Sequence, residues 1–204
     1  MMISAPVRRL AAVISWVGHP LLTSTAFVSF MAWQKLDDDP TAKWSLGSVA
    51  IMAALIGIWS FRQTYRGAYS NFDISQQEQR RSFYPVLLVL LGLATGVLFW
   101  QQAGLFRYGL LTAWLLLLTC YAVNFWLKIS LHAALSFFLA CVVLHLYSKW
   151  GVLALLLATV VAASRLVLRR HTLPELLAGT VAGVVAGGGL AWFLAHAAVN
   201  GMGS

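Results

Sequence analysis

The sequence predicts an all-α integral membrane protein, a bundle of six to seven transmembrane helices with its functional site at one membrane face. Three observations support this prediction. The 204 residues are 60% hydrophobic and only 10% charged, with a mean hydropathy of +0.79, far from the balance of soluble proteins. Apolar runs long enough to cross a bilayer, about 20 residues each, fill most of the chain. Between them the polar residues gather in short clusters.

The apolar runs leave no room for a soluble domain, so residues 1–204 are expected to form a single domain. The expected spans are residues 10–33, 44–62, 85–103, 107–127, 131–148, 150–168 and 174–198. Arg8 and Arg9 before the first run resemble the start of a signal peptide, but no small-residue cleavage site follows, which favours a retained span. Within it, His19-Pro20 predicts a kink at the proline and a histidine bonded to a neighbouring helix.

The net charge of +8 and pI of about 10.0 would indicate a nucleic-acid partner in a soluble protein. Here no basic domain exists to grip a duplex, so anionic membrane lipids and a phosphate-bearing ligand are the expected partners. Cys120 and Cys141 both fall inside expected spans. This placement favours apolar packing over a disulfide or a metal pair.

Three adjacent aspartates, Asp37 to Asp39, resemble the Mg²⁺-binding aspartates of membrane prenyltransferases. Consecutive side chains cannot all point at one ion in a helix, and no second acidic cluster completes a two-metal site. A solvated turn is therefore the favoured interpretation, with prenyl transfer kept as a remote alternative. No cofactor and no metal site is predicted.

The most informative cluster lies late in the chain, where Glu175 is the only acidic residue after Glu78. If residues 171–175 are helical, Glu175 and His171 lie one turn apart, and the carboxylate holds one imidazole N–H. Arg165 adds fixed positive charge nearby. This combination predicts a histidine that handles a phosphate.

A second polar cluster precedes the run at 131–148. Ser130 is a plausible helix cap, and the free N–H groups of the following helix would then point at an anion. His132 would project from the first turn, and Lys128 ends the preceding run. The longest polar stretch, residues 62–84, contributes Arg80 and Arg81, which favour either a phosphate contact or a headgroup-level position.

Parity of crossings brings these clusters together. Two expected spans separate the arginines at 80–81 from His132, and two more separate His132 from His171. All three clusters therefore return to one membrane face. Charged groups near hydrocarbon are costly unless they pair or face a wet cavity, so their convergence marks a site.

The same residues resemble the signatures of the type 2 phosphatidic acid phosphatase superfamily. Ser164, Arg165, His171 and Glu175 are similar to its third signature, Ser-Arg-x5-His-x3-Asp, with Glu for the final Asp. Ser130 and His132 keep the spacing of the second, Pro-Ser-Gly-His, but its Pro and Gly are missing. In the first, Lys-x6-Arg-Pro, only Arg80 is kept, because Asp73 stands for Lys and Arg81 for Pro.

The resemblance implies a metal-independent lipid phosphate phosphatase that works through a phosphohistidine. His171 would be the nucleophile, Glu175 its orienting partner and His132 the acid for the leaving group. The implied phosphate-binding residues are Arg165, Ser130, Lys128, Arg80 and Arg81. Phosphatidate, phosphatidylglycerol phosphate and polyprenyl diphosphate all fit as substrates.

Two further points stay open at this level. The departures from the first two signatures leave an alternative, a non-catalytic or transport-type membrane protein that keeps the family fold. The expected location is the plasma (inner) membrane. Arg8, Arg9, Arg62 and Arg66 on the site side favour the cytoplasmic face, but by a small margin over the basic residues of the opposite loops.

Overall fold

The computed structural model describes residues 4–33, 41–69, 76–104 and 106–199, and in this part of the chain it contains eight α-helices and no strand. The helices are α1 (Ala5–Val17), α2 (Pro20–Trp33), α3 (Thr41–Tyr65), α4 (Gln77–Trp100), α5 (Phe106–Val123), α6 (Leu131–Leu146), α7 (Ser148–Val167) and α8 (Leu173–Val199). The all-α class expected from the sequence is confirmed. Asp37 to Asp39 and Asp73 lie outside the described residues.

Among the described residues, four helices are long and apolar enough to cross a membrane: α4, α5, α7 and α8. The pair α1 and α2 passes the same test together, with a bend of 47° at its break, and raises the number to five. Helix α6 is apolar but has only 16 residues. The six to seven crossings expected from the sequence thus stay a prediction, while several candidate spans are present.

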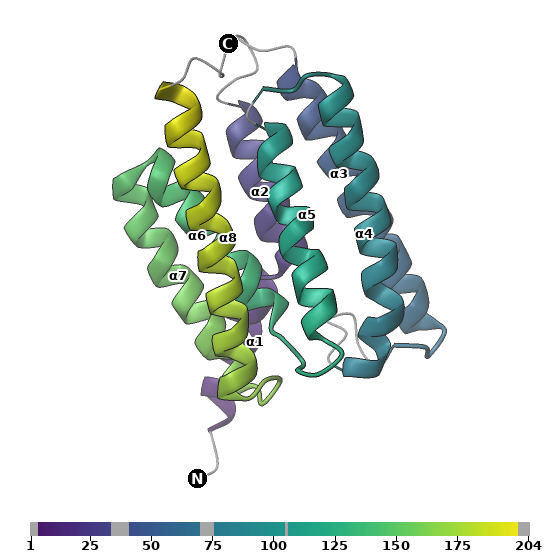
Figure 1. The fold of residues 1–204 in the computed structure, drawn as a ribbon. Coiled ribbons are helices and arrows are strands. Elements are labelled where there is room, and N and C mark those ends of the chain that lie inside the picture. Colours follow the sequence, from purple (N-terminus) through teal and green to yellow (C-terminus); the bar gives the residue numbers. More distant parts are fainter. Residues whose placement is uncertain (1–3, 34–40, 70–75, 105, 200–204) are drawn as a thin grey trace.

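The long helices stand side by side in one bundle (Figure 1). Helix α8 packs closely on α6, because glycines on α8 face the α6 backbone. A Cβ added at Gly179 would lie 2.5 Å from the carbonyl oxygen of Ser130, and one at Gly183 would overlap the carbonyl of Ala134. Small residues let helices approach this closely in lipid, as the glycine-rich sequence of α8 predicts.

Helix α4 starts well before the expected boundary. The sequence places residues 62–84 between spans, whereas α4 begins at Gln77 and carries Pro85 within it. The Nε2 atom of Gln77 donates to the carbonyl oxygen of Asn124 at 2.6 Å, which ties the start of α4 to the end of α5. The first turns of α4, which carry Arg80 and Arg81, are therefore held beside the end of α5.

The helical conformation is interrupted between α1 and α2, at Gly18 and His19. A side chain at Gly18 would overlap Val161 of α7, so a glycine is required there. The N–H of Leu21 is 3.3 Å from Nδ1 of His19, which caps the start of α2. The expected kink at Pro20 is realised as this break, and the break places an imidazole inside the bundle.

Candidate functional site

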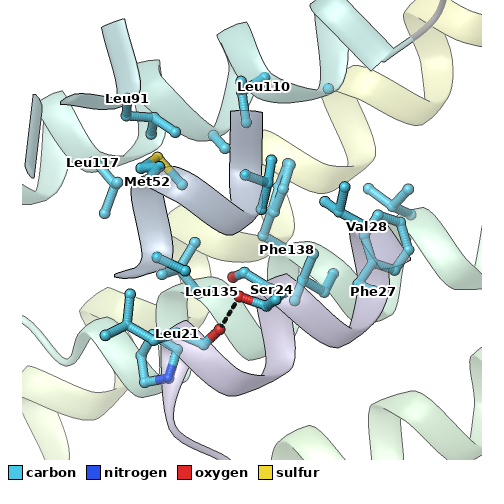
Figure 2. A pocket seen from close by; sticks show the side chains of 18 of the residues that line it. Leu21, Ser24, Phe27, Val28, Met52, Leu91, Leu110, Leu117, Leu135 and Phe138 are labelled. Carbon is cyan, nitrogen blue, oxygen red and sulfur yellow. Dashed lines mark hydrogen bonds between the residues drawn. The ribbon is translucent and has the colours of Figure 1, made fainter. Parts of the chain in front are cut away.

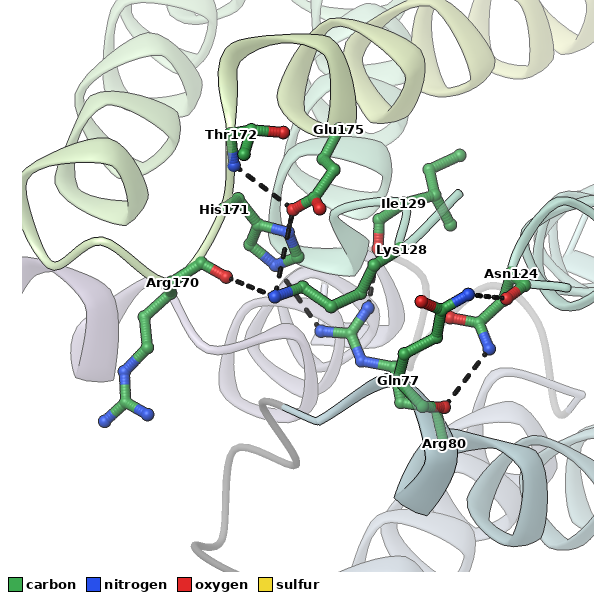
Figure 3. Close-up of polar contacts among 9 residues, drawn as sticks. All are labelled: Gln77, Arg80, Asn124, Lys128, Ile129, Arg170, His171, Thr172 and Glu175. Atoms are coloured by element: carbon green, nitrogen blue, oxygen red, sulfur yellow. Dashed lines mark hydrogen bonds and ion pairs between the residues drawn. The ribbon is translucent and has the colours of Figure 1, made fainter. Parts of the chain in front are cut away.

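Basic and imidazole side chains from separate segments meet at one end of the bundle. Figure 3 shows three of them, Arg80, Lys128 and His171. The full set comes from the start of α4, the loop before α6, the end of α7 and the α7–α8 loop. Their charged or ring groups are buried: Arg80 is 3% exposed, Arg165 1%, His132 4% and His171 6%. Such burial of cations and imidazoles is expensive and distinguishes this end of the bundle from an ordinary headgroup-level surface.

His171 is held by the first turn of α8. Its Nδ1 atom lies 2.9 Å from Oε2 of Glu175, and the same oxygen accepts the backbone N–H of Thr172 at 3.1 Å. The sequence predicts this pairing from a helical spacing of four, but α8 begins only at Leu173. Glu175 instead acts as a helix-capping carboxylate that reaches back to the imidazole.

Arg80 occupies the other side of the imidazole. Its Nη2 atom is 3.4 Å from Nε2 of His171, and its Nη1 atom donates to the carbonyl oxygen of Ile129 at 2.6 Å. A guanidinium has donors only, so Nε2 must be the acceptor in this contact. The proton of neutral His171 then sits on Nδ1 and is donated to Glu175, and Nε2 keeps its lone pair.

The loop before α6 contributes Lys128 and Ser130. Nζ of Lys128 donates to the carbonyl oxygen of Arg170 at 2.9 Å and lies 3.8 Å from Oε2 of Glu175. The backbone N–H of Ser130 donates to the carbonyl oxygen of Glu175 at 3.1 Å. Its hydroxyl accepts the N–H of Ala133, so Ser130 is the N-cap of α6, as the sequence predicts.

His132 and Arg165 form the deeper part of the cluster together with the α1–α2 break. Nη1 of Arg165 donates to the hydroxyl of Ser15 at 2.5 Å. The ring of His19 meets that of His132 edge to face, with 5.3 Å between the centroids. Sequence reasoning assigned no site role to Ser15 or His19. The signal was the position of both polar residues in an otherwise apolar run, just before Pro20.

The electrostatics keep His171 neutral. Burial, followed by the positive charges of Arg80, Arg165 and Lys128, lowers the pKa of His171 to about 2. Burial also lowers the pKa of Lys128, although Glu175 opposes the shift. Three cations thus act on the buried imidazole, and one of them, Lys128, also contacts the Glu175 carboxylate. The cluster has the charge to receive an anion.

Arg81 is the one predicted phosphate contact that lies apart from this cluster. Its side chain is exposed, and its guanidinium carbon sits 5.7 Å from the ring centroid of Phe125. Consecutive helix residues point about 100° apart, so once Arg80 faces inward Arg81 faces away. Of the two positions that the sequence left open for Arg81, a phosphate contact or the headgroup level, its exposed place fits the second.

Within the described ranges, no group of three or more His, Cys, Asp or Glu side chains is arranged to hold a metal ion. Cys120 and Cys141 are both free thiols.

Comparison of the chain with protein-family models, with curated proteins and with solved structures finds no match.

Proposed function

We propose that this chain is a membrane-embedded phosphatase that hydrolyses a lipid phosphate or diphosphate through a phosphohistidine intermediate. One observation carries the proposal: His171 is held neutral, with Nδ1 on Glu175 and with Nε2 facing Arg80. A neutral imidazole with a directed lone pair is what a nitrogen nucleophile requires. The described residues that match the phosphatase signatures and carry site roles also lie together: Arg80, Ser130, His132, Arg165, His171 and Glu175.

The chemistry follows from the residue types. A phosphate that enters the cluster takes the place of Nε2 as the partner of Arg80, and Nε2 attacks phosphorus as the bond to the lipid oxygen breaks. Glu175 stabilises the positive charge that develops on His171. His132 gives a proton to the departing oxygen. Water then attacks phosphorus and gives a proton back to His132 while the phosphorus–nitrogen bond breaks, which releases phosphate and the neutral imidazole.

Arg80, Lys128 and Arg165 hold the phosphate oxygens during transfer and balance the charge that builds up on them. Ser130 supports them as the cap of α6, since the first N–H groups of a helix favour anions. None of these steps draws on a metal ion.

The substrate is a lipid because the site lies at one end of an apolar bundle. A phosphate at the headgroup level with its tail in hydrocarbon reaches this place, as in phosphatidate, phosphatidylglycerol phosphate or polyprenyl diphosphate. We take α1 with α2 as one crossing and α3 to α8 as six more. The proposed location is the inner membrane, with the site at the cytoplasmic face.

The test uses purified full-length protein in detergent with a panel of lipid phosphates and no added metal. His171→Ala should lower phosphate release by at least about a hundredfold, since the nucleophile is lost. His145→Ala is the matched control, because His145 is exposed at the other end of α6. A labelled substrate should leave acid-labile phosphate on the wild type and none on His171→Ala.

If the wild type and His171→Ala released phosphate equally slowly, the proposal that the protein is a phosphatase would be refuted. If both still bound the lipid phosphate, the rival interpretation, a binding or transport protein, would take its place.

A further inference from the structure

A long cavity runs through the bundle from the polar cluster. Its volume is about 510 Å³, and the helices that line it are α2 to α6 and α8. His19, Arg80 and His132 stand at one end, and Phe106 and Leu146 stand toward the other. Figure 2 shows apolar side chains that line it, among them Leu91, Leu117 and Phe138.

The length of the cavity can be measured along α6. Lining residues of this helix extend from His132 to Leu146, which corresponds to about 21 Å at the helical rise. The hydrocarbon core of a bilayer is about 30 Å thick. The cavity is therefore long relative to the bundle and follows its axis.

A void of this size calls for an occupant. Protein interiors contain few spaces larger than one water molecule, and an unfilled cavity destabilises a fold in proportion to its volume. Water is a poor filler here, because most of the lining residues are apolar and a buried water needs several polar partners. An apolar molecule of matching shape would fill the space and would need no polar partners.

We propose that this cavity binds the hydrocarbon chain of the lipid whose phosphate occupies the Arg80–His171 cluster, so that the chain is drawn into the protein. The identity of the headgroup rests on the function proposed above. Because His132 and Arg80 line the cavity, the cavity is continuous with the polar cluster. A lipid whose phosphate is bound at the cluster therefore has its hydrocarbon chain at the mouth of the cavity.

Gly109 on α5 sets the length of the chain that fits. It lines the cavity, and a Cβ added there would meet no atom within 4 Å. Along α5 it lies about 12 Å farther from the cluster than Leu117. Ala113 lines the same wall one turn closer to the cluster. A large side chain at either position would close the cavity, at two different depths.

The first experiment measures binding without hydrolysis. A long-chain phosphatidate with a photoreactive group at the end of its chain is crosslinked to the full-length protein in detergent, and the labelled peptides are mapped. The wild type should be labelled on the cavity walls of α5 and α6. Gly109→Trp should lower this labelling at least about tenfold, because the indole fills the space in which several methylene groups of the lipid chain are buried. Gly96→Trp should leave it unchanged, since Gly96 has open space but lies outside the cavity.

The second experiment compares hydrolysis of long-chain and short-chain phosphatidate. Gly109→Trp should lower kcat/KM at least about tenfold for the long chain and less than about twofold for the short one. Ala113→Phe should extend the loss to chains of intermediate length, and it gives a second variant if Gly109→Trp does not fold.

Labelling confined to outward-facing residues such as Val89 and Val185, which are 61% and 68% exposed, would overturn the proposal. An equal loss for both chain lengths would overturn it as well. If no lipid releases phosphate while the crosslinks behave as expected, the phosphatase proposal fails. The proposed binding site for the hydrocarbon chain then still stands.

Discussion

The Nε2 atom of His171 lies 3.4 Å from Nη2 of Arg80, although the two residues are 91 positions apart in the chain. Helix α4 supplies one and the α7–α8 loop supplies the other. The contact directs the lone pair of His171 toward a cation, which is where a phosphate oxygen would bind. In the proposed function, Arg80 holds the phosphate beside that lone pair.

Replacement of Arg80 tests this arrangement. Arg80→Ala should lower kcat/KM for a lipid phosphate at least about a hundredfold, because a buried cation at the proposed phosphate position is lost. Arg80→Lys should recover only part of the activity, since an ammonium cannot reproduce the planar fork. Steady-state kinetics with the purified protein measure both.

Arg81→Ala is the matched control, because Arg81 is adjacent, exposed and turned toward Phe125. It should change kcat/KM by less than about twofold. Equal losses for the two alanine variants would mean that the inward and outward arginines do not differ in function.

Glu175 should act on the rate and not only on the fold. Glu175→Gln removes the charge that stabilises a positive His171 and should lower kcat about a hundredfold or more. Glu175→Asp keeps the charge and should retain more activity than Glu175→Gln. The readout is kcat together with the melting temperature, which separates catalysis from stability.

Glu78 gives the comparison for this pair, as an exposed glutamate in the first turn of α4. Glu78→Gln should behave as the wild type in kcat. A Glu175→Gln variant with normal kcat would remove the carboxylate from the mechanism.

The low pKa of His171 makes stability depend on pH. His171 has a pKa of about 2 in the fold against an ordinary value of 6.5, so the unfolded chain binds a proton more readily than the folded one. The contribution of the neutral histidine is complete above pH 6.5 and is lost progressively as the pH falls toward 2. Each pH unit in this window costs up to about 1.4 kcal/mol of unfolding free energy.

His171→Gln should therefore flatten the loss of stability between neutral and mildly acidic pH, as measured by unfolding in detergent. His196→Gln is the control, since His196 is exposed at the end of α8, and it should keep the wild-type profile. An unchanged profile in His171→Gln would show that the imidazole is not buried among cations.

The parts of the site that sequence could predict are those fixed by spacing along one chain segment. The four-residue spacing of His171 and Glu175 predicts their contact, and the turn at the start of α8 brings the two side chains together. Alternation of apolar runs likewise predicts that Arg80, His132 and His171 return to one end of the bundle. Arg80 contacts His171 and lines the same cavity as His132.

The remaining parts depend on contacts between helices, which no local spacing encodes. Arg81 could be separated from Arg80 only once α4 was known to start at Gln77, because a helix turns adjacent residues apart. His19 and Ser15 joined the site because the α1–α2 break packs Gly18 on Val161 of α7. The cavity is lined from six helices, and its shape follows from all of them together.

Close packing of α8 on α6 should hold Ser130 and His132 in place, and a single methyl group tests it. In Gly179→Ala the new Cβ would lie 2.5 Å from the carbonyl oxygen of Ser130 and 3.3 Å from Cβ of Ala133. The helices must then move apart, which costs about 1–3 kcal/mol. Gly188→Ala is the matched control on the same helix, because its Cβ would have no neighbour within 4 Å.

Gly188→Ala should be neutral or stabilise the protein by about 0.5–1 kcal/mol, since alanine favours a helix interior over glycine. Thermal unfolding in detergent measures both variants, and kcat is measured alongside. Gly179→Ala should lower kcat as well as the melting temperature, because the shift reaches the cap of α6 that positions His132. A Gly179→Ala variant as stable and active as Gly188→Ala would mean that the α6–α8 contact is looser than the structure has it.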